Sequence, residues 1–141
     1  MWLVLSLMFI MPLQAKTPDY IVKKVKNIPV ITAGGGYMVK EVIHPKNDNI
    51  NSGFSLAYIR LPQGKKTEPH ILKSSSQAFY ILKGKAILHI GKDKIEVSPG
   101  TAVYIAPGVV QWTENIGRGD FVFLCVVSPP WRASDEEVLK R

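Results

Sequence analysis

The chain has 141 residues, 46% of them hydrophobic and 21% charged, which supports one domain with a real core and excludes disorder of the whole chain. Its net charge of +7 favours anionic partners. The lysines are scattered as singles and pairs without an arginine-rich helix or an aromatic stacking motif, so we do not expect nucleic-acid binding.

The first element is an apolar run at residues 2–13, which has the length of a signal-peptide core and is short for a membrane span. Ala15 follows as a small residue at a suitable cleavage point. We therefore predict a leader at residues 1–15, an exported protein that is periplasmic or secreted, and no stable membrane anchor after leader removal. Because no Lys or Arg precedes the run, a buried N-terminal strand of a cytoplasmic protein is the alternative.

Short segments rich in Val, Ile, Phe and Tyr follow, separated by Gly, Pro, Asn and Asp turn signals. The predicted strands cover residues 20–30, 37–43, 54–61, 77–82, 85–90, 93–97, 102–105, 109–113 and 121–127. Many short strands without a long helical pattern predict an all-β sandwich or barrel within a single domain at residues 16–141. Only residues 134–141 have helical features, with Ser134 as a cap, acids in the first turn and basic residues in the last. They predict a short C-terminal helix.

Two motifs contain the candidate site residues. The first consists of Gly64, His70, Leu72, Gln77 and Gly84, and the second of Gly100, Pro107, Gly108, Gln111 and Asn115. Their spacing resembles the two motifs of the cupin superfamily over about residues 30–130. The Gly, Pro and Asn framework positions match, whereas only His70 matches among the four metal-binding positions. Leu72 and Gln111 stand where histidines are expected, and Gln77 stands where a glutamate is expected.

The resemblance implies a cupin jelly-roll β-barrel, a homodimer, and a pocket into which Gln77 and Gln111 point. On strand alternation, Phe79 shares the face of Gln77. We therefore expect His70, Gln77, Phe79 and Gln111 to bind a small organic ligand. The positive net charge favours an anionic one. With one imidazole and two neutral amides, His70, Gln77 and Gln111 would hold iron, manganese, nickel or zinc only weakly.

The sequence is compatible with two functions. One is a small-molecule-binding cupin with weak or absent metal binding. The other is a cupin enzyme, either a metal-dependent one of dioxygenase or isomerase type or a metal-free isomerase, which uses His70, Gln77 and Gln111. No catalytic residue is assigned, although Tyr58 and Tyr104 are candidate acids.

Three further residues receive structural interpretations. Cys125 lies in an apolar run and is expected to be buried, and as the single cysteine it forms no intramolecular disulfide. His44 precedes Pro45 and a polar loop, so we expect it at the surface. His89 alternates with apolar residues, and we favour a structural role for it.

Overall fold

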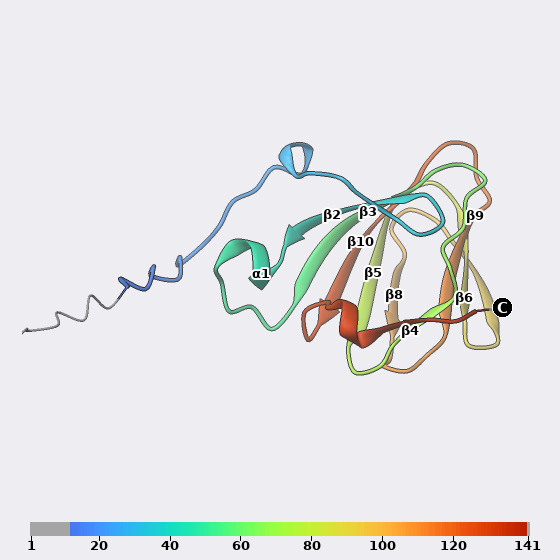
Figure 1. The fold of residues 1–141 in the computed structure, drawn as a ribbon. Coiled ribbons are helices and arrows are strands. Elements are labelled where there is room, and N and C mark those ends of the chain that lie inside the picture. The colour runs from blue at the N-terminus through green and yellow to red at the C-terminus, as the bar shows by residue number, and fades with distance from the viewer. Residues whose placement is uncertain (1–11, 141) are drawn as a thin grey trace, which may run out of the picture.

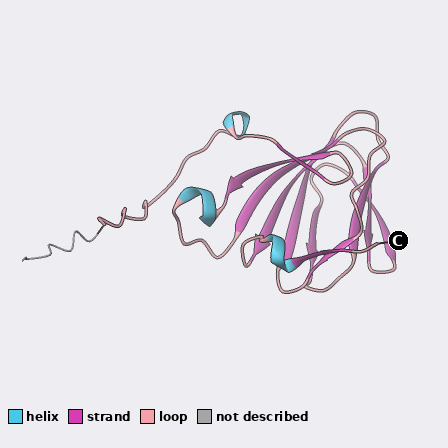
Figure 2. Ribbon diagram, viewed as in Figure 1, coloured by secondary structure: helices cyan, strands magenta, loops and turns pink. Residues whose placement is uncertain are grey.

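A computed structural model describes residues 12–140, so the predicted leader lies mostly outside the described residues. The body consists of two antiparallel sheets that face each other (Figures 1 and 2). The six-stranded sheet contains β1 (Ile31–Ala33), β2 (Tyr37–Ile43), β3 (Ser55–Leu61), β10 (Phe121–Ser128), β5 (Ser76–Lys83) and β8 (Ala102–Ile105), in that spatial order. The five-stranded sheet contains β11 (Glu136–Val138), β4 (His70–Leu72), β9 (Gln111–Asn115), β6 (Ala86–Ile90) and β7 (Asp93–Val97), again in spatial order.

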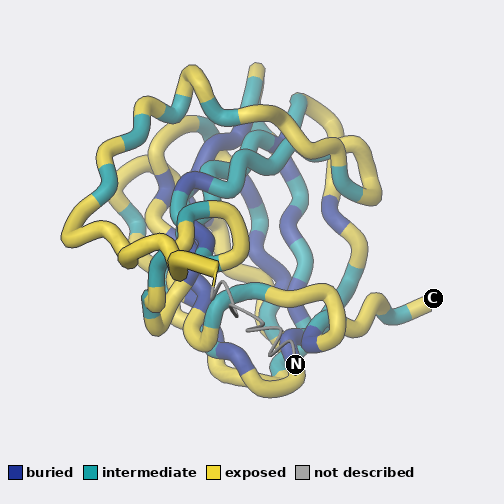
Figure 3. The backbone as a smooth tube through the Cα atoms, turned by 60° about the vertical axis from the view of Figure 1, so that its left-hand side comes forward, coloured by how far each residue is buried: buried dark blue, intermediate teal, exposed yellow. Residues whose placement is uncertain are grey.

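The core lies between the sheets, where alternate residues of each strand point inward. On β10 the inward residues are Phe121, Phe123, Cys125 and Val127, and on β5 they are Gln77, Phe79 and Ile81. Buried backbone follows the strands of both sheets, while turns are exposed (Figure 3). The predicted burial of Cys125 is confirmed.

Gly84 shows why one framework position requires glycine. Its φ is +85°, a conformation that side chains disfavour, and an added Cβ would lie 2.6 Å from the backbone oxygen of Asp120. The β5–β6 turn therefore packs directly on the chain that enters β10.

Most predicted strands are confirmed, and residues 37–43, 93–97 and 102–105 are strands with the predicted bounds. The all-β prediction is confirmed, and the strands form two antiparallel sheets. The described strands pair within each sheet and do not form one closed ring. Two short strands, β1 and β4, and the four-residue helix α1 (Pro45–Asp48) were not predicted. They are too short to show a period in the sequence.

The strand predicted at residues 20–30 is wrong. This segment is irregular, apart from a 3-10 turn at Val25–Asn27. The chain before it runs outward from the body (Figure 1), while Lys23 pairs with Asp48 of α1. Tyr20 and Val22 are more than 80% exposed, so these apolar side chains do not pack into the core between the sheets. No helix within residues 12–140 is long and apolar enough to cross a membrane.

The predicted C-terminal helix is also wrong. Residues Ala133–Asp135 form a 3-10 turn, and Glu136–Val138 form β11, which pairs with β4 and becomes the edge strand of the five-stranded sheet. An eight-residue helix is marginal in water, whereas strand pairing satisfies the open edge of β4. The Asp135 side chain, expected in the first turn of a helix, instead binds the loop that follows β4.

Candidate functional site

A cavity of about 340 Å³ lies between the two sheets. Most of its wall is hydrocarbon, supplied from the six-stranded sheet by residues such as Val39, Ile59, Phe79 and Phe123. Pockets for small ligands usually measure about 300–1,000 Å³ and combine apolar walls with a few polar groups. This cavity has that size and that character.

The four predicted ligand-binding residues line this one cavity. Gln77 and Phe79 come from β5, His70 from β4 and Gln111 from β9. His70 and Gln111 are direct cross-strand partners in the five-stranded sheet, while Gln77 faces them from the other sheet. The structure therefore brings together residues that lie up to 41 positions apart in the sequence.

Gln111 is the least satisfied of these groups. Gln111 is only 3% exposed. Its Nε2 is the one buried side-chain nitrogen or oxygen in residues 12–140 that has no hydrogen-bond partner. An unpaired buried donor costs about 1–3 kcal/mol. The cavity thus contains an amide N–H that a ligand with an acceptor would satisfy.

Gln77 differs from Gln111 because its oxygen already has a partner. The Cys125 thiol donates to Gln77 Oε1 over 3.7 Å, and both side chains line the cavity. Burial raises the pKa of the Cys125 thiol to about 12, so this sulfur stays protonated at neutral pH. The pair forms a neutral part of the wall.

His70 has a defined tautomer. Its Nδ1 lies 2.8 Å from the backbone oxygen of Glu68, and because a carbonyl only accepts, Nδ1 carries the hydrogen. In the neutral ring the lone pair is then on Nε2. The carboxylate of Glu136 lies 3.8 Å from this nitrogen and also lines the cavity.

Glu136 was missed from the sequence because its segment was assigned to a helix. The strand β11 is held in place by Asp135, whose carboxylate accepts hydrogen bonds from Ser74 N, at 2.9 Å, and Ser75 N, at 3.1 Å. The hydrogen bond from the Ser74 side chain, followed by those from the backbone, lowers the pKa of Asp135 below its ordinary value. Asp135 therefore positions the next residue, Glu136, beside His70.

The tyrosine in the cavity is Tyr37, not the two proposed from the sequence. Tyr58 and Tyr104 do not line the cavity, and Tyr104 is 69% exposed. Burial, followed by the charges of Glu136 and Glu68, raises the pKa of Tyr37 to about 12, so its phenol is neutral at physiological pH. Tyr37 belongs to β2, in which alternation also brings Val39 and Glu41 to the cavity.

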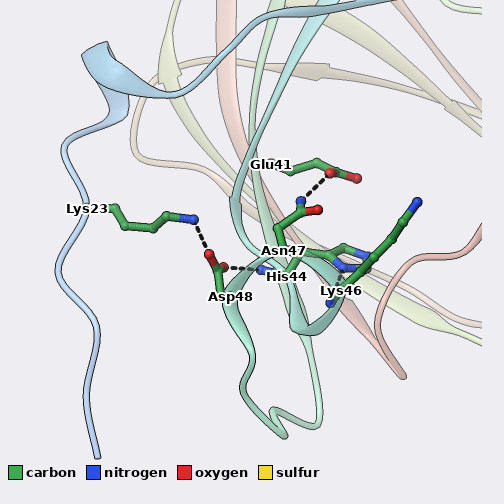
Figure 4. A network of polar contacts seen from close by, with 6 residues as sticks. All are labelled: Lys23, Glu41, His44, Lys46, Asn47 and Asp48. Atoms are coloured by element: carbon green, nitrogen blue, oxygen red, sulfur yellow. Dashed lines mark hydrogen bonds and ion pairs between the residues drawn. The ribbon is translucent and has the colours of Figure 1, made fainter. Parts of the chain in front are cut away.

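His44 also lines the cavity, so the surface position predicted for it is wrong: it is 8% exposed. Its Nε2 donates to the backbone oxygen of Trp131 over 2.8 Å, and its Nδ1 accepts from Lys46 N over 3.1 Å. The His44 backbone N–H donates to Asp48, which also pairs with Lys23 (Figure 4). Both ring nitrogens of His44 therefore make hydrogen bonds within a structural network.

The same network reaches Glu41. Asn47 Nδ2 donates to Glu41 Oε2 over 2.7 Å (Figure 4). His89, in contrast, does not line the cavity. It stacks on Trp112 with ring centroids 3.4 Å apart and lies 3.3 Å from a Glu114 oxygen, in agreement with a structural role.

The donor atoms do not fit a tightly bound transition metal. The His70 tautomer suits a ligand nitrogen, but Leu72 supplies a hydrocarbon and Gln77 Oε1 already accepts from Cys125. Within residues 12–140, Glu136 is the only carboxylate that pairs with the His70 ring. Among the described residues, no group of three or more His, Cys, Asp and Glu side chains is arranged to hold a metal.

Comparison with family models identifies the family, and comparison with known proteins finds a related sequence. A family model described as the cupin domain matches residues 57–127. An uncharacterised protein of Methanocaldococcus jannaschii is 36% identical over 114 residues, which span 79% of this chain and 88% of that protein.

Solved structures share the fold at low sequence identity. The polyketide cyclase RemF of Streptomyces resistomycificus matches with a TM-score of 0.73 and 17% identity, over 86% of this chain and 87% of that one. A predicted oxalate decarboxylase from Thermotoga maritima matches at 0.69 and 20%, over 77% of this chain and 98% of that one. The nucleoside dehydratase Pac13 of Streptomyces matches at 0.69 and 11%, over 86% and 92%.

Proposed function

This chain belongs to the cupin family, and we propose that it binds a small organic molecule in the cavity between its two sheets, with weak or absent metal binding. The observation that carries the proposal is the unpartnered Nε2 of Gln111 within a largely apolar wall. Apolar contacts supply affinity, and the Gln111 donor fixes the orientation of a carbonyl or hydroxyl acceptor. Relatives of this fold that act on polyketides and nucleosides support a cavity for small molecules.

The direct test has two parts. Native mass spectrometry of the full chain should detect a co-purified molecule, and ¹⁵N-labelled protein should show which fragments of a small-molecule library perturb the cavity residues. The Gln111→Leu variant should bind such a molecule about tenfold more weakly, because the donor is lost. The control is Gln63→Leu, which removes an exposed amide outside the cavity. Binding that leaves the cavity resonances unchanged, or that Gln111→Leu does not weaken, would refute the proposal.

A metal-free acid–base reaction is the second candidate function. It is favoured by the His70 Nε2 lone pair, the Glu136 carboxylate 3.8 Å away and the neutral phenol of Tyr37 in one cavity. Nε2 would take or return a proton, with Glu136 beside the positive charge and Tyr37 as hydrogen-bond donor. Once a ligand is known, turnover that is abolished by His70→Asn while binding persists would establish this reaction.

We also propose that the protein is exported and that it forms a homodimer. The apolar run at residues 2–13 supports a leader, and a row of exposed side chains on β5 and β8, including Tyr80, Leu82 and Tyr104, supports a second copy as partner. Amino-terminal sequencing of the protein from its native source tests the cleavage near residue 15. Sedimentation analysis tests the dimer, and Tyr104→Glu should weaken it.

A further inference from the structure

The charge inside the cavity is opposite to that of the whole chain. The net charge is +7, yet the cavity lining, all within the described residues, includes no Lys or Arg. It includes two carboxylates, Glu41 and Glu136. The lysines that make the protein basic therefore lie outside the lining of this cavity.

The two histidines of the lining do not cancel these carboxylates. His44 uses Nε2 as a donor and Nδ1 as an acceptor, so a second proton at Nδ1 would break its bond with Lys46 N. His70 can accept a proton at Nε2, where it would pair with Glu136, but Glu41 would remain. In either state of His70 the carboxylates outnumber the positive charges in the wall.

The carboxylates come from opposite sheets. Glu41 belongs to β2 in the six-stranded sheet, and Glu136 belongs to β11 in the five-stranded sheet. Both are partly exposed, with the Glu136 side chain at 26%, whereas Gln111 is 3% exposed. The acceptors thus lie toward solvent and the unpartnered donor lies deep in the wall.

From this arrangement we propose that the ligand is a small amine that also carries a hydroxyl or carbonyl oxygen, and that carboxylates and phosphates of similar shape bind more weakly. This inference rests on the proposed binding function and specifies the class of ligand. The oxygen would accept from Gln111 Nε2, and the ammonium would lie between Glu41 and Glu136. The neutral phenol of Tyr37 would add a further hydrogen-bonding group without charge.

Three probes of matched shape test the charge preference. They are 2-amino-1-phenylethanol, 1-phenyl-1,2-ethanediol and mandelate, which share a phenyl ring and a benzylic hydroxyl and are cationic, neutral and anionic. Titrations of the ¹⁵N-labelled full chain at low ionic strength give each dissociation constant and show whether cavity residues respond. We expect the amine to bind about tenfold more tightly than mandelate, with the diol between them.

Matched variants assign the preference to the cavity. Glu136→Gln and Glu41→Gln should each reduce the ratio of amine to mandelate affinity severalfold. Glu137→Gln is the control, because it makes the same charge change in β11 at an exposed residue outside the lining.

The possible failures are distinguishable. Mandelate binding in the cavity as tightly as the amine, or a ratio that neither cavity variant changes, would overturn the charge preference and leave the binding function intact. If none of the three probes perturbs the cavity residues, the inference fails together with the binding site on which it rests.

Discussion

Two buried carboxamides on one strand have different roles. Gln111 and Asn115 both point inward from β9, and both are at most 5% exposed. Asn115 Nδ2 donates to the backbone oxygens of Leu61 and Gly119, and Asn115 Oδ1 accepts from Gly117 N. Gln111 Nε2 has no partner. At the residue scale, Asn115 therefore stabilises the fold, whereas Gln111 keeps a donor available at the cost of stability.

Leucine substitutions should separate these roles. Gln111→Leu should raise the free energy of unfolding of the ligand-free protein by about 1 kcal/mol, because an unsatisfied donor is removed. Asn115→Leu should lower it by about 2–4 kcal/mol, because three hydrogen bonds are lost and their backbone partners stay buried. Urea denaturation of both variants measures the difference. Destabilisation of equal size in both would show that Gln111 is a structural residue.

At the element scale, the short strand β11 determines what the cavity contains. It carries Glu136 to the wall and is anchored by the hydrogen bonds of Asp135 to Ser74 and Ser75. The sequence of this segment is compatible with a helix start, because an acidic residue after Ser134 suits a first turn. Its actual structure depends on the loop after β4, which lies about 60 positions earlier. Local propensity could not reveal that contact.

The anchor should make stability depend on pH. Because the hydrogen bonds lower the pKa of Asp135 in the folded state, its stabilisation is complete above the ordinary aspartate value of 3.8 and is lost as pH falls through the lower folded value. Asp135→Asn should cost about 1–3 kcal/mol at pH 7 and should flatten the loss of stability in acid.

Urea denaturation between pH 7 and pH 3 measures this effect. Asp93→Asn at the exposed β6–β7 hairpin serves as the control and should leave the pH profile unchanged. An Asp135→Asn profile that is parallel to the wild-type profile would contradict the assigned anchor.

At the scale of the whole molecule, much of the architecture could be predicted because it depends on local patterns. Alternation and turn residues located most strands. The Gly, Pro and Asn framework, together with alternation for Phe79, placed His70, Gln77, Phe79 and Gln111 around one cavity. Tyr37, Glu41 and Glu136 were missed because the polar groups of β2 and β11 reach the site only through tertiary packing. The net charge likewise gave no guide to the charge within the cavity.

The arrangement also predicts how a metal site could be restored. Leu72, Gln77 and Gln111 all line the cavity with His70, so Leu72→His, Gln77→Glu and Gln111→His together should create a four-ligand site. Elemental analysis and competition titration with zinc should show an affinity at least about 100-fold above that of the unaltered chain. The same changes in a His70→Ala background provide the control. No gain over that control would show that these side chains do not converge on one point.

The proposed function depends on Gln111 offering its unpaired donor to a bound molecule. It is tested most directly by following the Gln111 side-chain ¹H–¹⁵N amide signals during titration with 2-amino-1-phenylethanol. We predict that these signals shift downfield and saturate together with the backbone signals of the other cavity residues. Saturation of binding while the Gln111 amide signals stay unchanged would contradict the claim.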